Sequence, residues 1–369
     1  MNQPYSAHTW TKAAQLVIRQ TPFTLALLRE RIVIMLKKFL VMITLLIAFF
    51  SLATAQDHPG FHVKGRHLYD KCGEKVILRG VNKMIIWKDI DGIPAYAEIA
   101  QTGANVVRIV WNDSGPALDL DKTITNCIAQ QMIPMVESHD ATGKWELLDK
   151  AVDYWIRPDI VPILQKHEQY LLLNIANECG DAGVTTEMFR TKYCEVIQKM
   201  RLAGIHVPLI IDATDWGKNI NILQSEGPAL LEADPDHNLI FSIHLWWPVM
   251  WGYSEKRIIE ELAESVAMEL PLIVGEFGNR WDETPGGVIP WRAILKQCQL
   301  YEIGWLAWSW GPGNKPQTFL DMTRDGSFAT LHDWGLAVAI TDSFSIKNTS
   351  VRPAFILNLN CEQAPGKNK

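Results

Sequence analysis

The sequence predicts an α/β protein whose parallel strands close into an eight-stranded barrel. Eight short apolar runs alternate along the chain with segments whose apolar residues recur every three or four positions. This alternation indicates repeated strand–helix units, and a sheet covered on both faces explains strands that are apolar throughout. The repeats span about 250 to 290 residues, the usual size of a (β/α)8 or TIM barrel. A doubly wound open sheet is the alternative, but no GxGxxG follows the first run.

The predicted elements follow one another without a linker. The expected strands are Val76–Asn82, Asn105–Trp111, Met132–His139, Tyr170–Glu178, Pro208–Thr214, Leu239–Trp246, Pro271–Gly278 and Ile303–Trp310. The clearest helical segments between them are Pro94–Thr102, Leu120–Gln131, Trp145–His167, Thr185–Ala203 and Ser254–Glu269. A small β-hairpin precedes the barrel from Phe61, with turns at Lys64-Gly65 and Cys72-Gly73. No stretch rich in Pro, Ser or Gly divides residues 56–369, so we expect one domain there.

The first 55 residues have the pattern of an extension ending in a secretory signal peptide. Lys37 and Lys38 precede the uncharged run Phe39–Leu52, and small residues then lead to a cleavage site expected after Ala55. The run is shorter than the roughly 20 residues that span a bilayer. We therefore expect a secreted or periplasmic protein with no stable membrane association after cleavage. Met35 is the expected start of translation, because a signal peptide begins shortly before its lysines.

The net charge and the cysteine spacing limit which ligands and binding partners are expected. The net charge is −6, and residues 1–55 carry six Lys or Arg against one Glu, so residues 56–369 carry −11. An acidic chain without a basic run is not expected to bind nucleic acid. The six cysteines show no CxxC or other metal-binding spacing, so a zinc site is not expected, and no cofactor is expected either. Export permits disulfides, and Cys298 with Cys361 is one hypothesis for a bridge.

Two predicted strands end in a glutamate. The strand from Tyr170 ends at Asn177-Glu178, and the strand from Pro271 ends near Glu276. The carboxyl ends of barrel strands form the active-site face, and a pair of carboxylates there is what glycoside hydrolysis requires. A structural ion pair with an arginine is the other interpretation of each glutamate alone. No HxH ends the first strand and no GxSxG is present, which disfavours binuclear metal sites and elbow serines.

Tryptophan is concentrated at the same predicted face. Of 15 Trp, ten lie at or just beyond strand ends: Trp87, Trp111, Trp145, Trp216, Trp246, Trp247, Trp251, Trp281, Trp308 and Trp310. Flat aromatic rings match the C–H faces of pyranose sugars. Any single one of these residues could instead cap the barrel, but together they predict an aromatic cleft for a polysaccharide.

The strand-end motifs resemble glycoside hydrolase family 5, most closely its bacterial endo-β-1,4-mannanases. The resemblance covers roughly Phe61 to Phe355. The matching pieces are VILRGVN (76–82), TGANVVRIV (102–110), ESHDATGKWE (137–146), NIANE (174–178), FSIH (241–244), IVGEFG (273–278), GWLAWSW (304–310) and SIKNTS (345–350). Eight such pieces in order make the resemblance specific.

This resemblance implies a retaining mechanism with Glu178 as acid/base and Glu276 as nucleophile, their carboxyl groups about 5 to 5.5 Å apart. The other matching positions imply substrate-binding or supporting roles for Arg108, Asn177, His139, His244 and Trp308, to which the aromatic pattern adds Trp87, Trp216 and Trp281. The family has a tyrosine two residues after the histidine that corresponds to His244, whereas this chain has Trp246. An indole N–H donates a hydrogen bond but neither accepts one nor ionises.

The expected function is thus a monomeric, secreted endo-β-1,4-mannanase. An endo-β-1,4-glucanase of the same family is the alternative, because mannose and glucose differ only at the 2-hydroxyl. A non-catalytic polysaccharide-binding barrel is a further alternative, suggested by Trp246.

Overall fold

The computed structural model describes residues 31, 33–38, 59–359 and 361. Residues 1–57 and 58–369 form separate units. In the first unit, residues 31 and 33–38 are helical and exposed. The predicted apolar run Phe39–Leu52 and the cleavage site after Ala55 lie outside the described residues. Among the helices that are described, none combines the length and hydrophobicity needed to cross a membrane.

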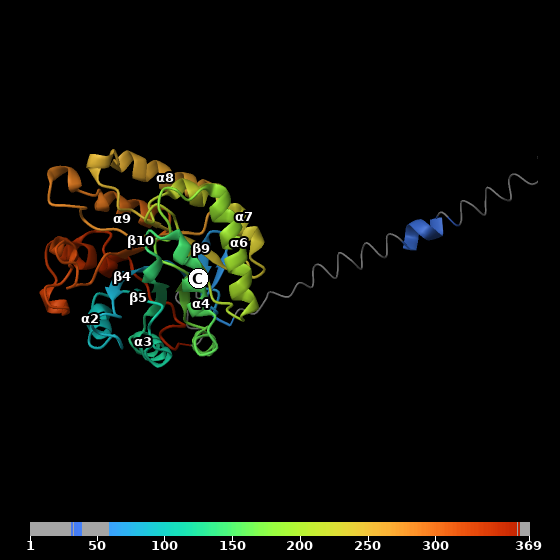
Figure 1. The fold of residues 1–369 in the computed structure, drawn as a ribbon, viewed down its shortest axis with the longest axis horizontal. Helices are drawn as coiled ribbons and strands as arrows, with labels where there is room; N and C mark the ends of the chain where they lie inside the picture. Colours follow the sequence, from blue (N-terminus) through green and yellow to red (C-terminus); the bar gives the residue numbers. More distant parts are fainter. Residues whose placement is uncertain (1–30, 32, 39–58, 360, 362–369) are drawn as a thin grey trace, which may run out of the picture. The chain divides into compact units, whose positions relative to one another are not determined.

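Eight parallel strands close into a barrel, which confirms the predicted (β/α)8 fold (Figure 1). The barrel strands are β4 (Arg79–Met84), β5 (Val106–Trp111), β6 (Ile133–Ser138), β7 (Leu172–Asn174), β8 (Leu209–Asp212), β9 (Leu239–His244), β10 (Leu272–Glu276) and β11 (Gly304–Ala307). They pair in sequence order, and β11 pairs with β4 to close the ring.

The inward-facing side chains change from apolar to polar along the strands. Because side chains alternate between the two faces of a strand, Val106 and Arg108 of β5 both point into the barrel, as do Ile210 and Asp212 of β8. The first member of each pair belongs to a buried apolar cluster inside the barrel. The second member is a buried charged residue near the carboxyl end of its strand. The apolar layer thus supports a polar layer above it.

A small sheet lies beside the apolar layer. The predicted hairpin is present as β1 (His62–Lys64) and β2 (His67–Tyr69), and it continues into β3 (Lys75–Val76). The predicted first strand began at Val76, but Val76 pairs with Leu68 of this sheet, and the barrel strand begins only at Arg79. Phe61, Leu68 and Val76 pack into the same apolar cluster as the barrel interior.

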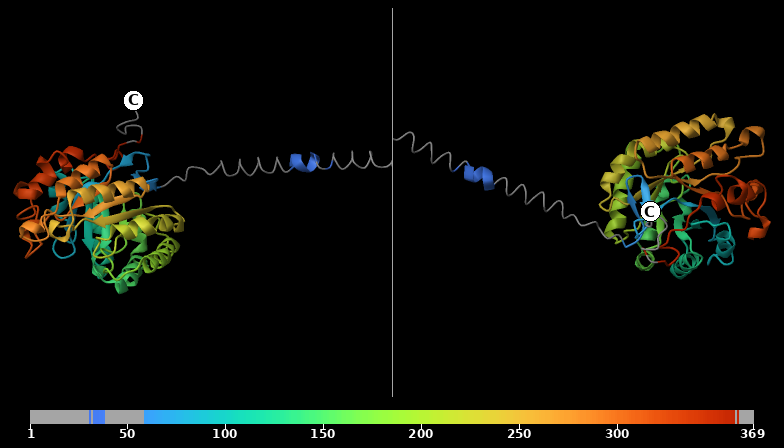
Figure 2. Two further views of the ribbon diagram at one scale, coloured as in Figure 1. Left: turned by 90° about the horizontal axis from the view of Figure 1, so that it is seen from above. Right: turned by 180° about the vertical axis from the view of Figure 1, so that it is seen from behind.

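The C-terminal segment lies against this sheet, as the two views in Figure 2 show. Phe355 packs edge-on against Phe61, with ring centroids 6.0 Å apart. A disulfide joins Cys72 to Cys361. The hypothesis of a Cys298–Cys361 bridge is therefore wrong: Cys298 is a buried free thiol on the inner face of α9.

The main helices lie between the strands in sequence. They are α2 (Ala95–Ala100), α3 (Ala117–Ala129), α4 (Leu148–Trp155), α5 (Val161–Lys166), α6 (Thr186–Leu202), α7 (Ile220–Ala233), α8 (Glu255–Ala267) and α9 (Trp291–Leu300), with the short α10 (Asp333–Leu336) and α11 (Ile346–Thr349) after β11. The single helix predicted over Trp145–His167 is wrong, since α4 and α5 are separate. Pro158 lies between them, and proline lacks the N–H that a continuous helix needs.

Candidate active site

Arg108 is the centre of the polar layer inside the barrel. Its guanidinium donates hydrogen bonds to the side chains of Asn82, Asn174, Asn177, Asp212 and Glu276, which come from the ends of four different strands or the turns after them. The side chain is fully buried. Burial lowers the pKa of Arg108, but the charges of Glu137, Glu276 and Asp212 outweigh it and raise the pKa above its ordinary value. A permanent cation therefore balances the acids around it.

Glu276 is the last residue of β10, and hydrogen-bond donors hold both of its carboxylate oxygens. Its Oε1 accepts from Nη1 of Arg108 at 2.7 Å, and its Oε2 accepts from Nε1 of Trp246 at 3.1 Å. In the register of the barrel Glu276 lies opposite His244 of β9, whose Nδ1 is 3.6 Å from Oε2. The carboxylate is thus fixed in one orientation at the rim of the barrel.

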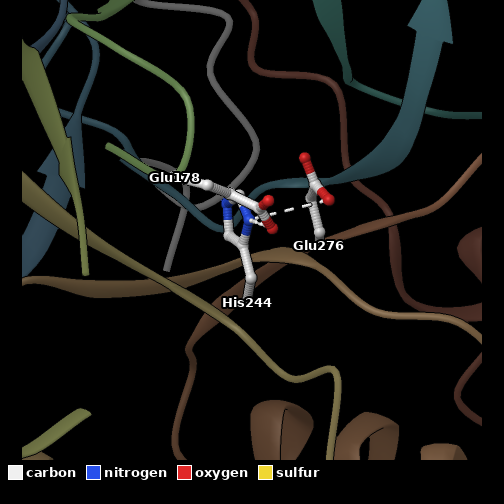
Figure 3. A group of neighbouring side chains, drawn as sticks. All are labelled: Glu178, His244 and Glu276. Carbon is white, nitrogen blue, oxygen red and sulfur yellow. Dashed lines mark hydrogen bonds and ion pairs between the residues drawn. The ribbon is translucent and has the colours of Figure 1, made fainter. Parts of the chain in front are cut away.

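Glu178 lies four residues beyond the end of β7, so the predicted strand Tyr170–Glu178 is too long. Its backbone adopts the left-handed conformation with φ of 44°, which costs a non-glycine residue of order 1 kcal/mol and is typical of functional sites. The conformation is held by its backbone N–H, which donates to Oδ2 of Asp212 at 3.0 Å. It directs the carboxyl toward His244, whose Nδ1 is 2.8 Å from Oε1 (Figure 3).

Glu178, His244 and Glu276 converge on one point although they come from three separate strands or strand ends. One oxygen of Glu178, one oxygen of Glu276 and a ring nitrogen of His244 all lie within 4.8 Å of one another. Among the described residues, this is also a group whose atoms could surround a metal ion. The hydrogen bonds within the group account for the geometry, and chemistry by paired carboxylates does not require a metal.

The surroundings shift the pKa values of Glu178, His244 and the neighbouring Asp212 in different directions. Burial and the charge of Glu276 raise the pKa of Glu178, which favours its protonated form. Burial lowers the pKa of His244, but the charges of Glu276 and Asp212 outweigh it and raise the pKa to about 10. For Asp212, burial raises the pKa, but His244 and Arg108 outweigh it and lower the pKa to about 2. The site therefore places a neutral carboxylic acid beside a cationic histidine and an anionic aspartate.

A cavity of about 410 Å³ opens above the two glutamates. It is lined by His139, Glu178, Trp216, Lys218, Trp246, Trp251, Glu276, Trp281, Trp308, Gln317 and Leu320. His139 stacks on Trp308 at 5.9 Å with 15° between the rings, and its Nδ1 lies 2.8 Å from Oε1 of Glu137. Burial lowers the pKa of His139, but Glu137 outweighs it and raises the pKa. Aromatic walls with a few fixed polar groups suit a sugar chain.

The structure separates the ten predicted rim tryptophans into three groups. Five of them line the cavity, and Trp87 is exposed and meets the edge of His139 at 5.7 Å. The other four do not line it: Trp111, Trp247 and Trp310 are buried, and Trp145 packs on Phe189 and Tyr193. Trp111, Trp247 and Trp310 belong to the main buried hydrophobic cluster and Trp145 packs against it, so these four rings have a packing role.

Asn177, like Arg108 and His244, is buried and is not among the side chains that line the cavity. Its Oδ1 accepts from Arg108 at 2.6 Å and its Nδ2 donates to Thr142 at 2.8 Å, so it contacts the guanidinium and the neighbouring turn. Two buried residues of the polar layer, Glu137 and Asn174, were not among the predicted site residues. Their signal in the sequence is a polar side chain on the inward face of an otherwise apolar strand.

Comparison with known proteins also indicates a glycoside hydrolase. The family model described as "Cellulase (glycosyl hydrolase family 5)" matches residues 69–314. A mannan endo-1,4-beta-mannosidase of Cellvibrio japonicus (strain Ueda107) is 32% identical over 313 residues, covering 81% of this chain and 70% of that protein. One from Salipaludibacillus agaradhaerens is 33% identical over 283 residues, covering 75% of this chain and 89% of that protein. A solved beta-mannanase from Streptomyces thermolilacinus with mannohexaose has a TM-score of 0.74 and 30% identity, covering 82% of this chain and 99% of that chain.

Proposed function

Because the chain belongs to glycosyl hydrolase family 5 and is a glycoside hydrolase, we propose that it cleaves β-1,4-mannosidic bonds inside mannan chains with retention of configuration. The observation that carries the proposal is the pair Glu178 and Glu276, whose carboxyl oxygens lie within 4.8 Å of each other at the floor of an aromatic cavity. A retaining enzyme needs carboxyl groups about 5 Å apart, whereas an inverting enzyme needs room for a water molecule and a separation of roughly 6.5 to 9.5 Å.

In the first step, the Glu276 carboxylate attacks the anomeric carbon while Glu178 protonates the departing glycosidic oxygen. The bond from the anomeric carbon to that oxygen breaks, and an ester bond to Glu276 forms. Cationic His244 donates its Nδ1–H to Oε1 of Glu178, so the proton that Glu178 delivers resides on Oε2. The raised pKa of Glu178 keeps this proton in place until the sugar binds.

In the second step, Glu178 takes a proton from water and the water oxygen attacks the anomeric carbon, releasing Glu276. The structure supports this change of role because the charge of Glu276 is one of the causes that raise the pKa of Glu178. That charge is absent from the ester, so the pKa of Glu178 falls and its carboxylate becomes a base. The same residue thus acts as acid and then as base.

The substrate assignment follows the relatives and the aromatic cavity. Trp308 is the proposed platform beneath the sugar at the cleavage point, with its indole held by a 2.8 Å hydrogen bond from Nε1 to Oδ1 of Asn314. Trp216, Trp281 and Trp87 are proposed further contacts with the chain. An endo-β-1,4-glucanase is the second candidate, because the matching family model is described as a cellulase.

Three experiments test these proposals. Reducing-sugar release from galactomannan, glucomannan and carboxymethylcellulose separates the substrates, and activity on carboxymethylcellulose alone would overturn the mannanase assignment. The anomeric configuration of the first product, followed by NMR, tests retention. Glu178→Gln and Glu276→Gln are each expected to lower kcat by a factor of roughly 10² or more. Unchanged turnover in both variants, or binding of glycans without cleavage, would support a non-catalytic barrel instead.

We also propose that the protein is exported and acts as a monomer in the periplasm or outside the cell. The proposal rests on the N-terminal sequence pattern and on the size of the expected substrate, a polymer that does not enter cells. N-terminal sequencing of the exported protein is expected to begin at Gln56, and a product that retains residues 1–34 would contradict the proposed start at Met35.

A further inference from the structure

Glu137 is a buried acid to which the proposed mechanism gives no role. It is the next-to-last residue of β6, and the alternation of that strand places it on the same inward face as Ile133 and Met135. These two residues belong to the apolar layer inside the barrel, so the Glu137 carboxylate lies in the polar layer above it. The side chain is fully buried. An ionised carboxylate in such a place destabilises the fold unless partners compensate for the lost water.

The nearest partner of this carboxylate is His139. The Nδ1 atom of His139 lies 2.8 Å from Oε1 of Glu137, whereas Nη1 of Arg108 lies 3.7 Å from the same oxygen. The other oxygen, Oε2, is buried and has no hydrogen-bond partner among the described residues. An unsatisfied buried oxygen lowers stability, so stability alone does not explain an acid at this position.

Two kinds of contact hold the His139 ring. It stacks on Trp308 at 5.9 Å with 15° between the rings, and Trp87 meets it at 5.7 Å and 84°. These aromatic contacts fix the plane of the imidazole, but they do not distinguish the ring from one turned by 180° about its Cβ–Cγ bond. The bond to Glu137 does, because Nδ1 is the only donor on that side of the ring.

With Nδ1 held by Glu137, Nε2 is the ring nitrogen that can meet a ligand. His139 lines the cavity together with Glu178 and Glu276, and its side chain is 23% exposed. Burial lowers the pKa of His139, Glu137 and Glu276 raise it, and Arg108 lowers it, with a raised pKa as the result. In the cationic ring Nε2 carries a proton and donates, whereas in the neutral ring with a proton on Nδ1 it only accepts.

We propose that Glu137 is a positioning residue, which holds His139 so that its Nε2–H donates to a hydroxyl group of the sugar that rests on Trp308. The inference rests on the proposed function and adds to it an acid that does not touch the substrate. The carboxylate acts in two ways, since its oxygen orients the ring and its charge favours the doubly protonated form. A donor that is already fixed loses little freedom when the sugar binds.

The test is a double-mutant cycle of Glu137→Gln and His139→Gln, with kcat/KM measured on mannan. Glutamine keeps the size of the side chain and an oxygen acceptor but removes the charge. Glu137→Gln is expected to lower kcat/KM about tenfold or more in the wild type, and less than about twofold in His139→Gln, because its effect passes through the ring. An equal loss in both backgrounds would show that Glu137 acts on Arg108 or on the fold, and either this result or no loss at all would overturn the inference.

A second readout does not depend on turnover. The pKa of His139, followed through its ring C–H signal by NMR, is expected to fall by about one unit or more in Glu137→Gln. An unchanged pKa would overturn the pairing. If Glu137→Gln does not fold, Glu137→Asp replaces it, because the shorter side chain withdraws its oxygen from Nδ1, and the same dependence on His139 is expected. If the wild type cleaves carboxymethylcellulose and not mannan, the proposed substrate fails, and the cycle on that polymer still tests the pair.

The matched control is Asp121→Asn, which removes the charge from another acid–histidine pair. Oδ1 of Asp121 lies 2.6 Å from Nε2 of His167, and this pair joins α3 to the end of α5 rather than lining the cavity. The variant is expected to lower the pKa of His167, which Asp121 raises, and to leave kcat/KM unchanged. A loss of activity equal to that of Glu137→Gln would show that the assay reports a general effect on the fold, which would overturn the inference.

Discussion

Replacing Trp246 with phenylalanine removes one of the two hydrogen bonds that orient the Glu276 carboxylate. The 3.1 Å bond from the indole to Oε2 disappears, while the 2.7 Å bond from Arg108 to Oε1 remains. A hydrogen bond to a charged group contributes about 1.5 to 3 kcal/mol. If that stabilisation is expressed in the transition state, kcat/KM falls by a factor of about 10 to 150. The carboxylate then rotates more freely, so it spends a smaller fraction of the time facing the anomeric carbon.

The matched variant is Trp246→Tyr, which offers a hydroxyl donor in place of the indole N–H. Both variants are assayed for kcat and KM on mannan, together with the thermal midpoint Tm. Trp246→Tyr is expected to recover most of the activity that Trp246→Phe loses, with Tm similar in the two. If Trp246→Phe stays within twofold of the wild type, or if both variants lose the same activity, the indole hydrogen bond does not position the nucleophile.

Three further predictions concern stability. Arg108→Gln leaves Glu276 and Asp212 without their buried counter-charge and is expected to lower the free energy of unfolding by about 3 to 5 kcal/mol in urea titrations; an unchanged midpoint would contradict the electrostatic role. The pKa of His244 is raised from 6.5 to about 10, so its charge stabilises the fold fully below pH 6.5 and this contribution disappears as the pH rises to 10. The variant His244→Asn is therefore expected to have a lower unfolding free energy than the wild type below pH 6.5, and this difference is expected to shrink as the pH rises to 10. A difference that stays constant with pH would refute the raised pKa of His244. Cys72→Ser removes the bridge to Cys361 and is expected to cost about 2 to 5 kcal/mol of unfolding free energy without changing kcat, because the bridge joins the small sheet to the C-terminal segment, away from the glutamates. A parallel loss of kcat would show that the bridge also shapes the site.

The repeat of strands and helices is predictable from the sequence because the pattern of apolar residues in each element reflects how that element is buried. A barrel strand is covered on both faces, so its apolar run is visible without knowledge of its neighbours. The sequence predicts the ends of the strands and helices less accurately. The residues Ile175 and Ala176 continue the apolar run after β7 but lie in a bend, and the expected helix from Trp145 is interrupted before Val161. At the first boundary the backbone hydrogen bonds of the folded chain, rather than the local pattern, decide where the strand ends. At the second boundary Pro158 interrupts the helix.

The roles of the tryptophans and cysteines could not be predicted in the same way. Trp247 and Trp251 are four residues apart in one loop, yet the first is buried on Tyr253 and the second faces the cavity. Composition and local spacing are similar for the two, so only packing distinguishes them. The partner of Cys361 likewise depends on where the C-terminal segment lies, and it lies against the small sheet that contains Cys72.

By itself, the sequence determined the barrel fold, the family and the two acids that end strands at its rim. Tertiary structure alone decided that Arg108 and Trp246 each hold one oxygen of Glu276, that a left-handed residue directs Glu178 to His244, and which aromatic rings remain open to a ligand. The physical reason is that burial and turn preferences are local properties of the chain. Contacts between residues on different strands instead depend on the register with which the barrel closes, and that register is a property of all eight strands together.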